Sequence, residues 1–119
     1  MYFNLSPEEY EALQTLPKGY TAMLPRSHRY STVGNGWTVE VIVHILRHFD
    51  KITTLPVEVL SIYDGISCGH VALDRLSVDI RKYFAMEIDK YAIACTQANF
   101  PNTIQLGDAF QVRDEGWTL

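Results

Sequence analysis

The stretch VEVLSIYDGISCG, residues 57–69, decides the fold of this chain. Its first seven residues are rich in β-branched and apolar side chains, a composition typical of a buried strand. Asp64 and Gly65 close that strand, and a helix is predicted to begin near Cys68 or Gly69. A strand that runs through a short turn into a helix is the first half of a strand–helix–strand unit.

The same pattern repeats towards the C-terminus. Residues 82–88 are predicted to form a second strand, residues 90–99 a second helix, and residues 103–106 a third strand. This alternation favours an α/β fold: a partial Rossmann-like arrangement of the doubly wound type, with a parallel sheet of about three strands flanked by helices. With 119 residues, the chain is expected to be a single domain.

The N-terminal half is predicted to contribute helices. Residues 6–9, Ser-Pro-Glu-Glu, are typical of a helix start with a capping box, and proline and glycine oppose continuation at residues 17–19. Residues 18–35 are expected to be irregular. Residues 37–49 form a predicted amphipathic helix, whose apolar face consists of Val39, Ile42, Ile45, Leu46 and Phe49.

Polar residues follow the predicted strands at the edge where parallel sheets bind ligands. The glycine turn at residues 63–69 lets a ligand approach the backbone. Glu87 follows Gly65 by 22 residues, near the offset at which an acid reaches ribose hydroxyls, and Asp108 is placed to accept a hydrogen bond from an exocyclic amine. Each feature alone also fits a helix cap or an ordinary turn. Together they favour a nucleotide-like ligand, while the lack of GxGxxG disfavours nicotinamide or flavin cofactors.

Several stretches resemble motifs of the DNA cytosine-5 methyltransferases, particularly the de novo-type branch and phage relatives. Residues 59–69 resemble the first motif, and residues 86–90 and 106–108 look like the second and third. Residues 5–20 and 29–39 resemble the last two motifs of the family. The chain therefore looks like a circularly permuted, truncated member.

The permutation divides the chain into residues 1–50, which resemble the last two motifs, and residues 57–119, which resemble the three cofactor motifs. The resemblance implies S-adenosylmethionine as cofactor. In the family the final motif folds beside the first strand and completes the cofactor pocket. The residues implied in cofactor binding are Tyr63, Asp64, Gly65, Ile66, Cys68, Glu87, Ile88, Asp108, Ala109, Asn35, Gly36 and Trp37.

The cytosine-attacking residues of the family are missing from these 119 residues. The family uses a cysteine that follows a proline, acting on a flipped-out base. Here the prolines are followed by Glu8, Lys18, Arg26, Val57 and Asn102. Cys68, at a helix start, could have a lowered thiol pKa, although a small pocket-lining residue is the ordinary interpretation. No catalytic residue is assigned, and methyl transfer by this chain alone is not expected.

Composition limits the partners of the chain. The net charge is −4, with no cluster of Lys and Arg, so DNA binding is expected to be weak or to depend on a partner. No metal site is predicted. Without a bilayer-spanning stretch or a secretion signal, the expected location is cytoplasmic.

The family resemblance also implies that residues 57–63 form an exposed edge strand, which another subunit, a second copy or a segment of the chain itself should cover. Two functions stay open. One is a noncatalytic methyltransferase-like protein that acts through a protein partner, such as a regulator or phage-type inhibitor of host defence. The other is the cofactor-binding subunit of a split DNA cytosine-5 methyltransferase. A degenerate fold that retains only a surface is a third possibility.

Overall fold

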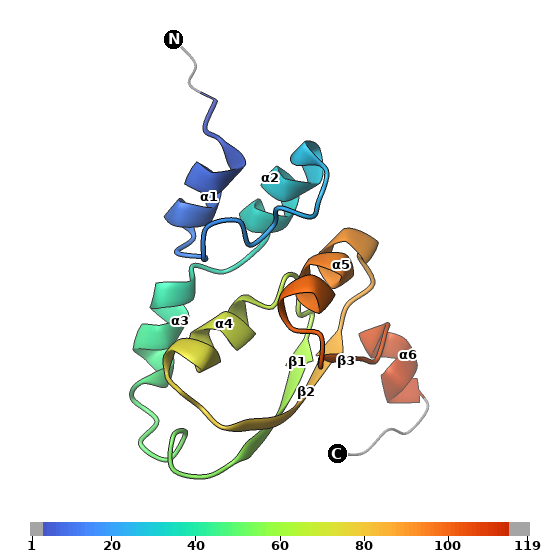
Figure 1. The fold of residues 1–119 in the computed structure, drawn as a ribbon. Coiled ribbons are helices and arrows are strands. Elements are labelled where there is room, and N and C mark those ends of the chain that lie inside the picture. Colours follow the sequence, from blue (N-terminus) through green and yellow to red (C-terminus); the bar gives the residue numbers. More distant parts are fainter. Residues whose placement is uncertain (1–3, 115–119) are drawn as a thin grey trace.

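A computed structural model describes residues 4–114, in which three helices precede an alternation of strands and helices (Figure 1). The first part contains α1 (Pro7–Leu13), α2 (Arg26–Gly34) and α3 (Val39–Leu46). The second part runs β1 (Val57–Ile62), α4 (Cys68–Arg75), β2 (Ile80–Met86), α5 (Lys90–Asn99), β3 (Ile104–Gln105) and α6 (Ala109–Asp114). No helix in these residues is long and apolar enough to cross a membrane.

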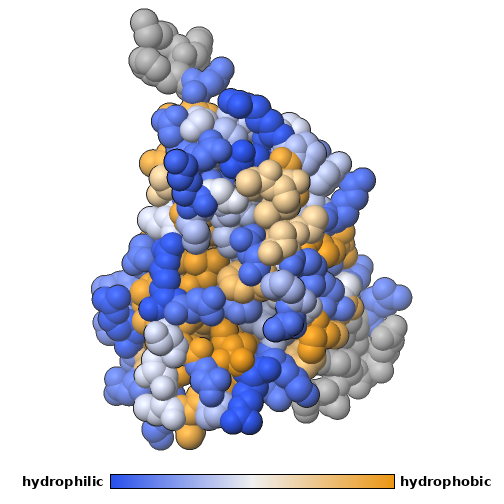
Figure 2. All heavy atoms as spheres, viewed as in Figure 1, coloured by the Kyte–Doolittle hydropathy of each residue, from blue (hydrophilic) through white to orange (hydrophobic). Residues whose placement is uncertain are grey.

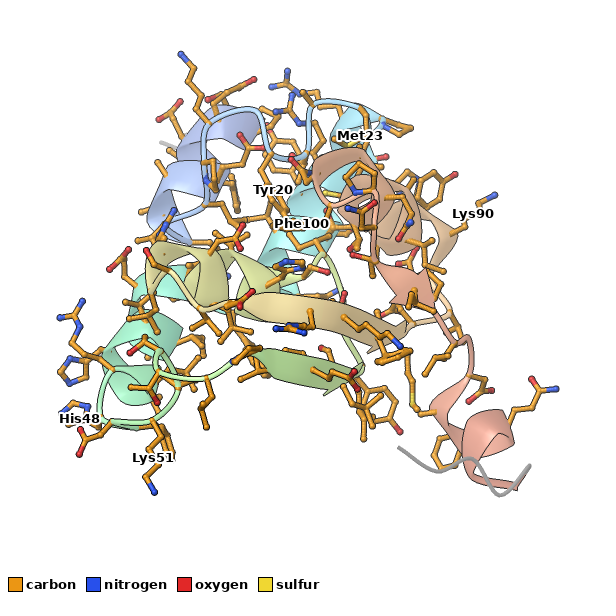
Figure 3. The ribbon with its side chains drawn as sticks, turned by 60° about the horizontal axis from the view of Figure 1, so that its bottom comes forward. Tyr20, Met23, His48, Lys51, Lys90 and Phe100 are labelled. Atoms are coloured by element: carbon orange, nitrogen blue, oxygen red, sulfur yellow. The ribbon has the colours of Figure 1, made fainter. Side chains whose placement is uncertain are left out.

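The strands form a parallel sheet in the order β1-β2-β3. Leu60 of β1 lies opposite Phe84 of β2, which in turn lies opposite Ile104 of β3. The connecting helices α4 and α5 lie on one face of this sheet (Figures 1 and 3), as expected when the strand order advances in one direction. The predicted α/β fold, a partial Rossmann-like parallel sheet flanked by helices, is confirmed.

A continuous core joins the two parts of the chain. Tyr20, Val33 and Val39 from the N-terminal part belong to the same buried cluster as Ile66 and Cys95 from the second part. A smaller cluster fills the space between α4 and β2 and contains Leu73, Val78, Tyr83 and Ala85. Because the N-terminal helices share this core with α4, α5 and the turn after β1, the segment between α2 and α3 is held beside that turn.

Local sequence signals predict several boundaries correctly. Ser6 Oγ accepts a hydrogen bond from the Glu9 N–H at 3.2 Å, while the Glu9 side chain accepts one from the Ser6 N–H at 3.1 Å, which is the predicted capping box. The predicted helix over residues 90–99 matches α5, where Asp89 caps the first turn. These elements are specified by side chains close in sequence.

The expectation that residues 18–35 are irregular is wrong, because α2 occupies Arg26–Gly34. Its sequence carries few apolar residues, so its periodicity gives little signal. Val33 is fully buried and Thr32 nearly so. This tertiary packing stabilises a helix that the local sequence pattern does not predict.

The predicted apolar face of the next helix is also partly wrong. The helix ends at Leu46, and Ile45 and Phe49 are 52% and 59% exposed. Val39 is buried as predicted, and the second buried residue is Val43, four residues further on, which the predicted face did not include. β2 begins and ends two residues earlier than predicted, which leaves Glu87 and Ile88 beyond the strand. α6 has no counterpart in the prediction.

Candidate functional site

Two small hollows adjoin at the carboxyl ends of β1 and β2. The first measures about 40 Å³ and is lined by Asn35, Gly36, Trp37, Ser61, Tyr63, Asp64, Gly65, Cys68 and Gly69. The second measures about 160 Å³ and is lined by Thr32, Asn35, Tyr63, Gly65, Ile66, Glu87, Asp89 and Ala92. Asn35, Tyr63 and Gly65 line both hollows, so we treat them as one site and call it the strand-end cleft.

The turn after β1 forms the centre of the strand-end cleft. Tyr63, Gly65 and Ser67 have positive φ values of 58°, 61° and 65°, a conformation that costs free energy for residues other than glycine. The Tyr20 hydroxyl donates to the Ile66 carbonyl oxygen at 2.5 Å and anchors the turn from the N-terminal part of the chain. Tyr63 is 69% exposed, so its ring stands at the mouth of the cleft.

Glu87 joins the end of β2 to this turn. Its Oε1 accepts a hydrogen bond from the Gly65 N–H at 2.8 Å, and its Oε2 accepts from the Ile88 and Asp89 N–H groups at 3.0 and 2.9 Å. An ionised carboxylate accepts about four hydrogen bonds. Glu87 therefore keeps acceptor capacity for one more donor in the cleft.

The segment between α2 and α3 forms the opposite wall. Gln14 Nε2 donates to the carbonyl oxygens of Val33 and Gly36, at 3.0 Å each, and Gln14 Oε1 accepts from the Thr38 hydroxyl at 2.6 Å. Gly36 is needed for a close approach, since a Cβ at this position would lie 3.0 Å from Cys68 Sγ. The wall and the turn therefore touch directly.

Both thiols are buried, and burial raises the pKa of each. The pKa of Cys68 rises to about 11 and that of Cys95 to about 12. The Trp37 N–H lowers the pKa of Cys68 only in part. The alternative that the helix start lowers the pKa of Cys68 is therefore wrong, and Cys68 is a small residue lining the cleft.

Nine of the twelve residues implied in cofactor binding line the strand-end cleft: Asn35, Gly36, Trp37, Tyr63, Asp64, Gly65, Ile66, Cys68 and Glu87. The other three, Ile88, Asp108 and Ala109, do not line either hollow. Ile88 is 75% exposed. Asp108 Oδ1 accepts a hydrogen bond from the Phe110 N–H at 2.9 Å, as a cap at the start of α6.

The structure adds lining residues that the sequence did not single out: Thr32, Ser61, Gly69, Asp89 and Ala92. Gly69 is the last residue of the predicted turn 63–69, and Ser61 lies two residues before that turn, so the sequence spacing already places both near the cleft. Thr32 was missed together with its helix. Among residues 4–114, no group of three or more His, Cys, Asp or Glu could hold a metal ion.

Sequence comparison relates the chain to known proteins. No protein-family model matches the chain. DNA (cytosine-5)-methyltransferase DRM2 of Arabidopsis thaliana is 29% identical over 112 residues, which cover 92% of this chain and 18% of that protein. Over the matched region, the chain is related to the DNA cytosine-5 methyltransferases.

Two rice proteins (Oryza sativa subsp. japonica) extend this relationship. DRM2 is 30% identical over 83 residues, or 70% of this chain and 14% of that protein. DRM1A is 26% identical over 116 residues, or 95% of this chain and 24% of that protein. The methyltransferase-related chain thus spans less than a quarter of the length of these relatives.

Proposed function

We propose that the chain binds S-adenosylmethionine in the strand-end cleft. The observation that carries the proposal is the meeting of Gly65 and Glu87 with the segment 35–37, which comes from the other part of the chain. The relatives are named as DNA cytosine-5 methyltransferases, a family whose methyl donor is S-adenosylmethionine. Bound there, the cofactor would supply an activated methyl group.

The residues present fit such a ligand. Glu87 lies within hydrogen-bonding distance of the Gly65 backbone and keeps one acceptor site, suited to a ribose hydroxyl. Gly65 leaves space, because a Cβ built on it meets no atom within 4 Å. The amino-acid end of the ligand would lie by Cys68 and the segment 35–37. The adenine would lie towards Asp108 and Ala109, beyond the enclosed part of the cleft.

We further propose that the chain acts through a protein partner. Its 119 residues contain no cysteine that follows a proline, and Cys68 and Cys95 are buried with raised pKa values. Neither thiol is suited to attack a cytosine ring. A partner polypeptide would then supply the cysteine that attacks cytosine and the contacts to DNA.

The exposed edge of β1 supports this second proposal. Within the described sheet, β1 pairs only with β2. Beside it lies an open groove of about 480 Å³, lined mostly by apolar residues: Trp37, Ile42, Leu46, Ile52, Val57, Glu58, Val59, Leu60, Ser61, Ile62, Gly69, Leu73 and Tyr83. Figure 2 shows apolar side chains gathered around α4 and in the lower half of the molecule.

The groove is continuous with the strand-end cleft, since Trp37, Ser61 and Gly69 line both. The enclosed hollows are smaller than the roughly 300–1,000 Å³ of complete small-molecule sites. A partner strand that pairs with β1 would cover the groove and add a wall to the cleft at Ser61. The occupant we propose is therefore a polypeptide that carries the cytosine-attacking residues.

Titration calorimetry with S-adenosylmethionine tests the cofactor proposal. We expect heat of binding for the wild type and about tenfold or greater loss of affinity for Glu87→Ala, because a hydrogen bond to a charged group contributes about 1.5–3 kcal/mol. Asp50→Ala, which removes an exposed acid after α3, should bind like the wild type. A folded wild type that releases no heat and gains no thermal stability with the ligand would sink the proposal.

A methylation assay with tritiated S-adenosylmethionine and duplex DNA tests the partner proposal. The chain alone should transfer no label, and transfer by the chain unaided would overturn the proposal. Transfer that requires a second polypeptide with the Pro-Cys motif favours the split enzyme. Stable binding of a partner without transfer favours a noncatalytic regulator, which is the second candidate function.

A pair of surface variants locates the partner. Ile62→Lys places a charge in the groove, while Val41→Lys changes an equally exposed apolar residue on α3 that does not line it. We expect Ile62→Lys to weaken association and Val41→Lys to leave it unchanged. Light scattering separates a second copy of the chain from a different partner.

A further inference from the structure

The buried Tyr83 of β2 reaches the strained turn of the strand-end cleft through its hydroxyl. Tyr83 is only 4% exposed, and its ring stacks on His70 with 4.2 Å between the ring centroids. Its hydroxyl donates a hydrogen bond to Asp64 Oδ1 at 2.7 Å. The ring thus contributes to the core, while the hydroxyl contacts Asp64, which lines the cleft.

Asp64 connects Tyr83 to the turn through two hydrogen bonds with Ser67. The Ser67 hydroxyl donates to Asp64 Oδ2, and the Ser67 N–H donates to the Asp64 carbonyl oxygen at 3.1 Å. Ser67 is fully buried in the left-handed conformation, with φ of 65°. A non-glycine residue keeps such a conformation only where its surroundings compensate the cost. The Asp64 carboxylate is positioned to do this.

Thr96 of α5 closes the network from the opposite side. Its Oγ1 lies 3.0 Å from Ser67 Oγ and 3.3 Å from the Gly65 carbonyl oxygen. Since Ser67 donates to Asp64, its oxygen is free to accept from Thr96. The single Thr96 hydroxyl proton is shared between Ser67 Oγ and the Gly65 carbonyl oxygen. Tyr83, Asp64, Ser67 and Thr96 therefore form one hydrogen-bonded network beside the Gly65 backbone.

The direction of the first hydrogen bond is fixed by protonation. Burial, and secondarily the Asp64 charge, raise the pKa of Tyr83 well above its ordinary value. The phenol is therefore protonated at neutral pH, and it donates to the carboxylate.

We infer that Tyr83 is a positioning residue, whose hydroxyl acts through Asp64 to hold the turn 63–67 in the shape that receives the ligand. This inference rests on the proposed binding of S-adenosylmethionine in the strand-end cleft. Tyr83 lies beneath the turn and is not among the residues that line either hollow of the cleft. Its effect on affinity would come from pre-organisation of Gly65 and Ser67.

Tyr83→Phe removes the hydroxyl and keeps the ring, so it tests the inference with little disturbance of the core. We expect about tenfold weaker binding of S-adenosylmethionine in titration calorimetry, together with faster amide hydrogen exchange at Gly65 and Ser67 in the ligand-free protein. Tyr30→Phe is the matched control, because it removes a similar hydrogen bond, to the Leu5 carbonyl oxygen at 2.6 Å. That variant should retain wild-type affinity and exchange at the turn.

A double-mutant cycle separates positioning from a general loss of stability. If Tyr83 acts through Asp64, Tyr83→Phe should add no further loss of affinity in an Asp64→Ala background. Full additivity of the two changes would overturn the inference, as would wild-type exchange and affinity in Tyr83→Phe. If the wild type binds no S-adenosylmethionine, the proposed function fails, while the exchange rates at Gly65 and Ser67 still decide whether Tyr83 holds the turn.

Discussion

Gln14, at the end of α1, donates a hydrogen bond from Nε2 to the Gly36 carbonyl oxygen at 3.0 Å, 22 residues away in sequence. The same amide nitrogen donates to the Val33 carbonyl oxygen, and its oxygen accepts from the Thr38 hydroxyl. One side chain thus fixes the whole segment that forms the wall of the strand-end cleft opposite the turn. The wall depends on α1, although α1 contributes no residue to the cleft lining.

Gln14→Glu should therefore weaken both stability and ligand binding. The change removes the two N–H donors and turns a carboxylate oxygen towards the carbonyl oxygens of Val33 and Gly36. We expect a loss of about 2 kcal/mol in the free energy of unfolding, measured with urea, because two partly buried acceptors lose their partners. Gln111→Glu, the same change at an exposed position in α6, should have no measurable effect on either property.

Gly36→Ala tests the contact between the wall and the turn. The added Cβ would lie 3.0 Å from Cys68 Sγ and 3.3 Å from the Val33 carbonyl oxygen. Both neighbours are buried, so we expect a loss of about 1–3 kcal/mol in unfolding free energy and weaker binding of S-adenosylmethionine.

Two further variants make this prediction specific. Gly34→Ala should be neutral or slightly stabilising, because a Cβ there meets no atom within 4 Å and the residue ends a helix. Cys68→Ala should restore part of the loss in a Gly36→Ala background, since it removes the sulfur that the new methyl group would meet. Equal destabilisation by the alanines at 34 and 36 would contradict the close approach.

The sequence predicts the sheet and its turn better than it predicts the N-terminal helices. The strand of residues 57–63 and the helix of residues 90–99 are signalled by residues close together in the chain. α2 is not, because it is stabilised by burial of Val33 against residues far away in sequence. For the same reason the network that starts at Tyr83 cannot be read from spacing, since its members come from β2, α5 and the turn.

Thiol alkylation tests the role assigned to Cys68. Its pKa is raised to about 11 by burial, so its thiolate fraction at pH 7–8 is far below that of an ordinary cysteine, whose pKa is about 8.5. We expect iodoacetamide to modify the folded protein much more slowly than the protein in urea. In the variants Cys68→Ser and Cys95→Ser only one thiol remains, so mass spectrometry of each variant gives the alkylation rate of that thiol. Rapid alkylation of Cys68 in the folded chain near neutral pH would contradict a purely structural thiol.

The buried carboxylate of Glu11 should make the free energy of unfolding depend on pH. This carboxylate is fully buried and accepts hydrogen bonds from the Gly19 N–H at 2.8 Å, and from the Thr21 N–H and hydroxyl at 2.7 Å each. Arg29 Nη2 lies 3.5 Å from Glu11 Oε2. Burial raises the pKa of Glu11, but these hydrogen bonds and the Arg29 charge outweigh it and hold the pKa below the ordinary value of 4.5.

A carboxylate with a lowered folded-state pKa stabilises the protein above its unfolded-state pKa, and this stabilisation is lost as the pH falls through the folded-state pKa. At pH 7 we expect Glu11→Gln to cost about 3 kcal/mol, because it leaves Arg29 and the backbone donors without the charge they surround. The difference from the wild type should shrink between pH 4.5 and pH 3, as the wild-type carboxylate takes up a proton.

Glu40→Gln, which removes an exposed ion pair with Arg75, should cost less than about 1 kcal/mol. If Glu11→Gln lowers the free energy of unfolding by the same amount at pH 7 and pH 3, the Glu11 charge does not stabilise the fold. The contacts with Thr21 and Gly19 would then act only through packing and uncharged hydrogen bonds.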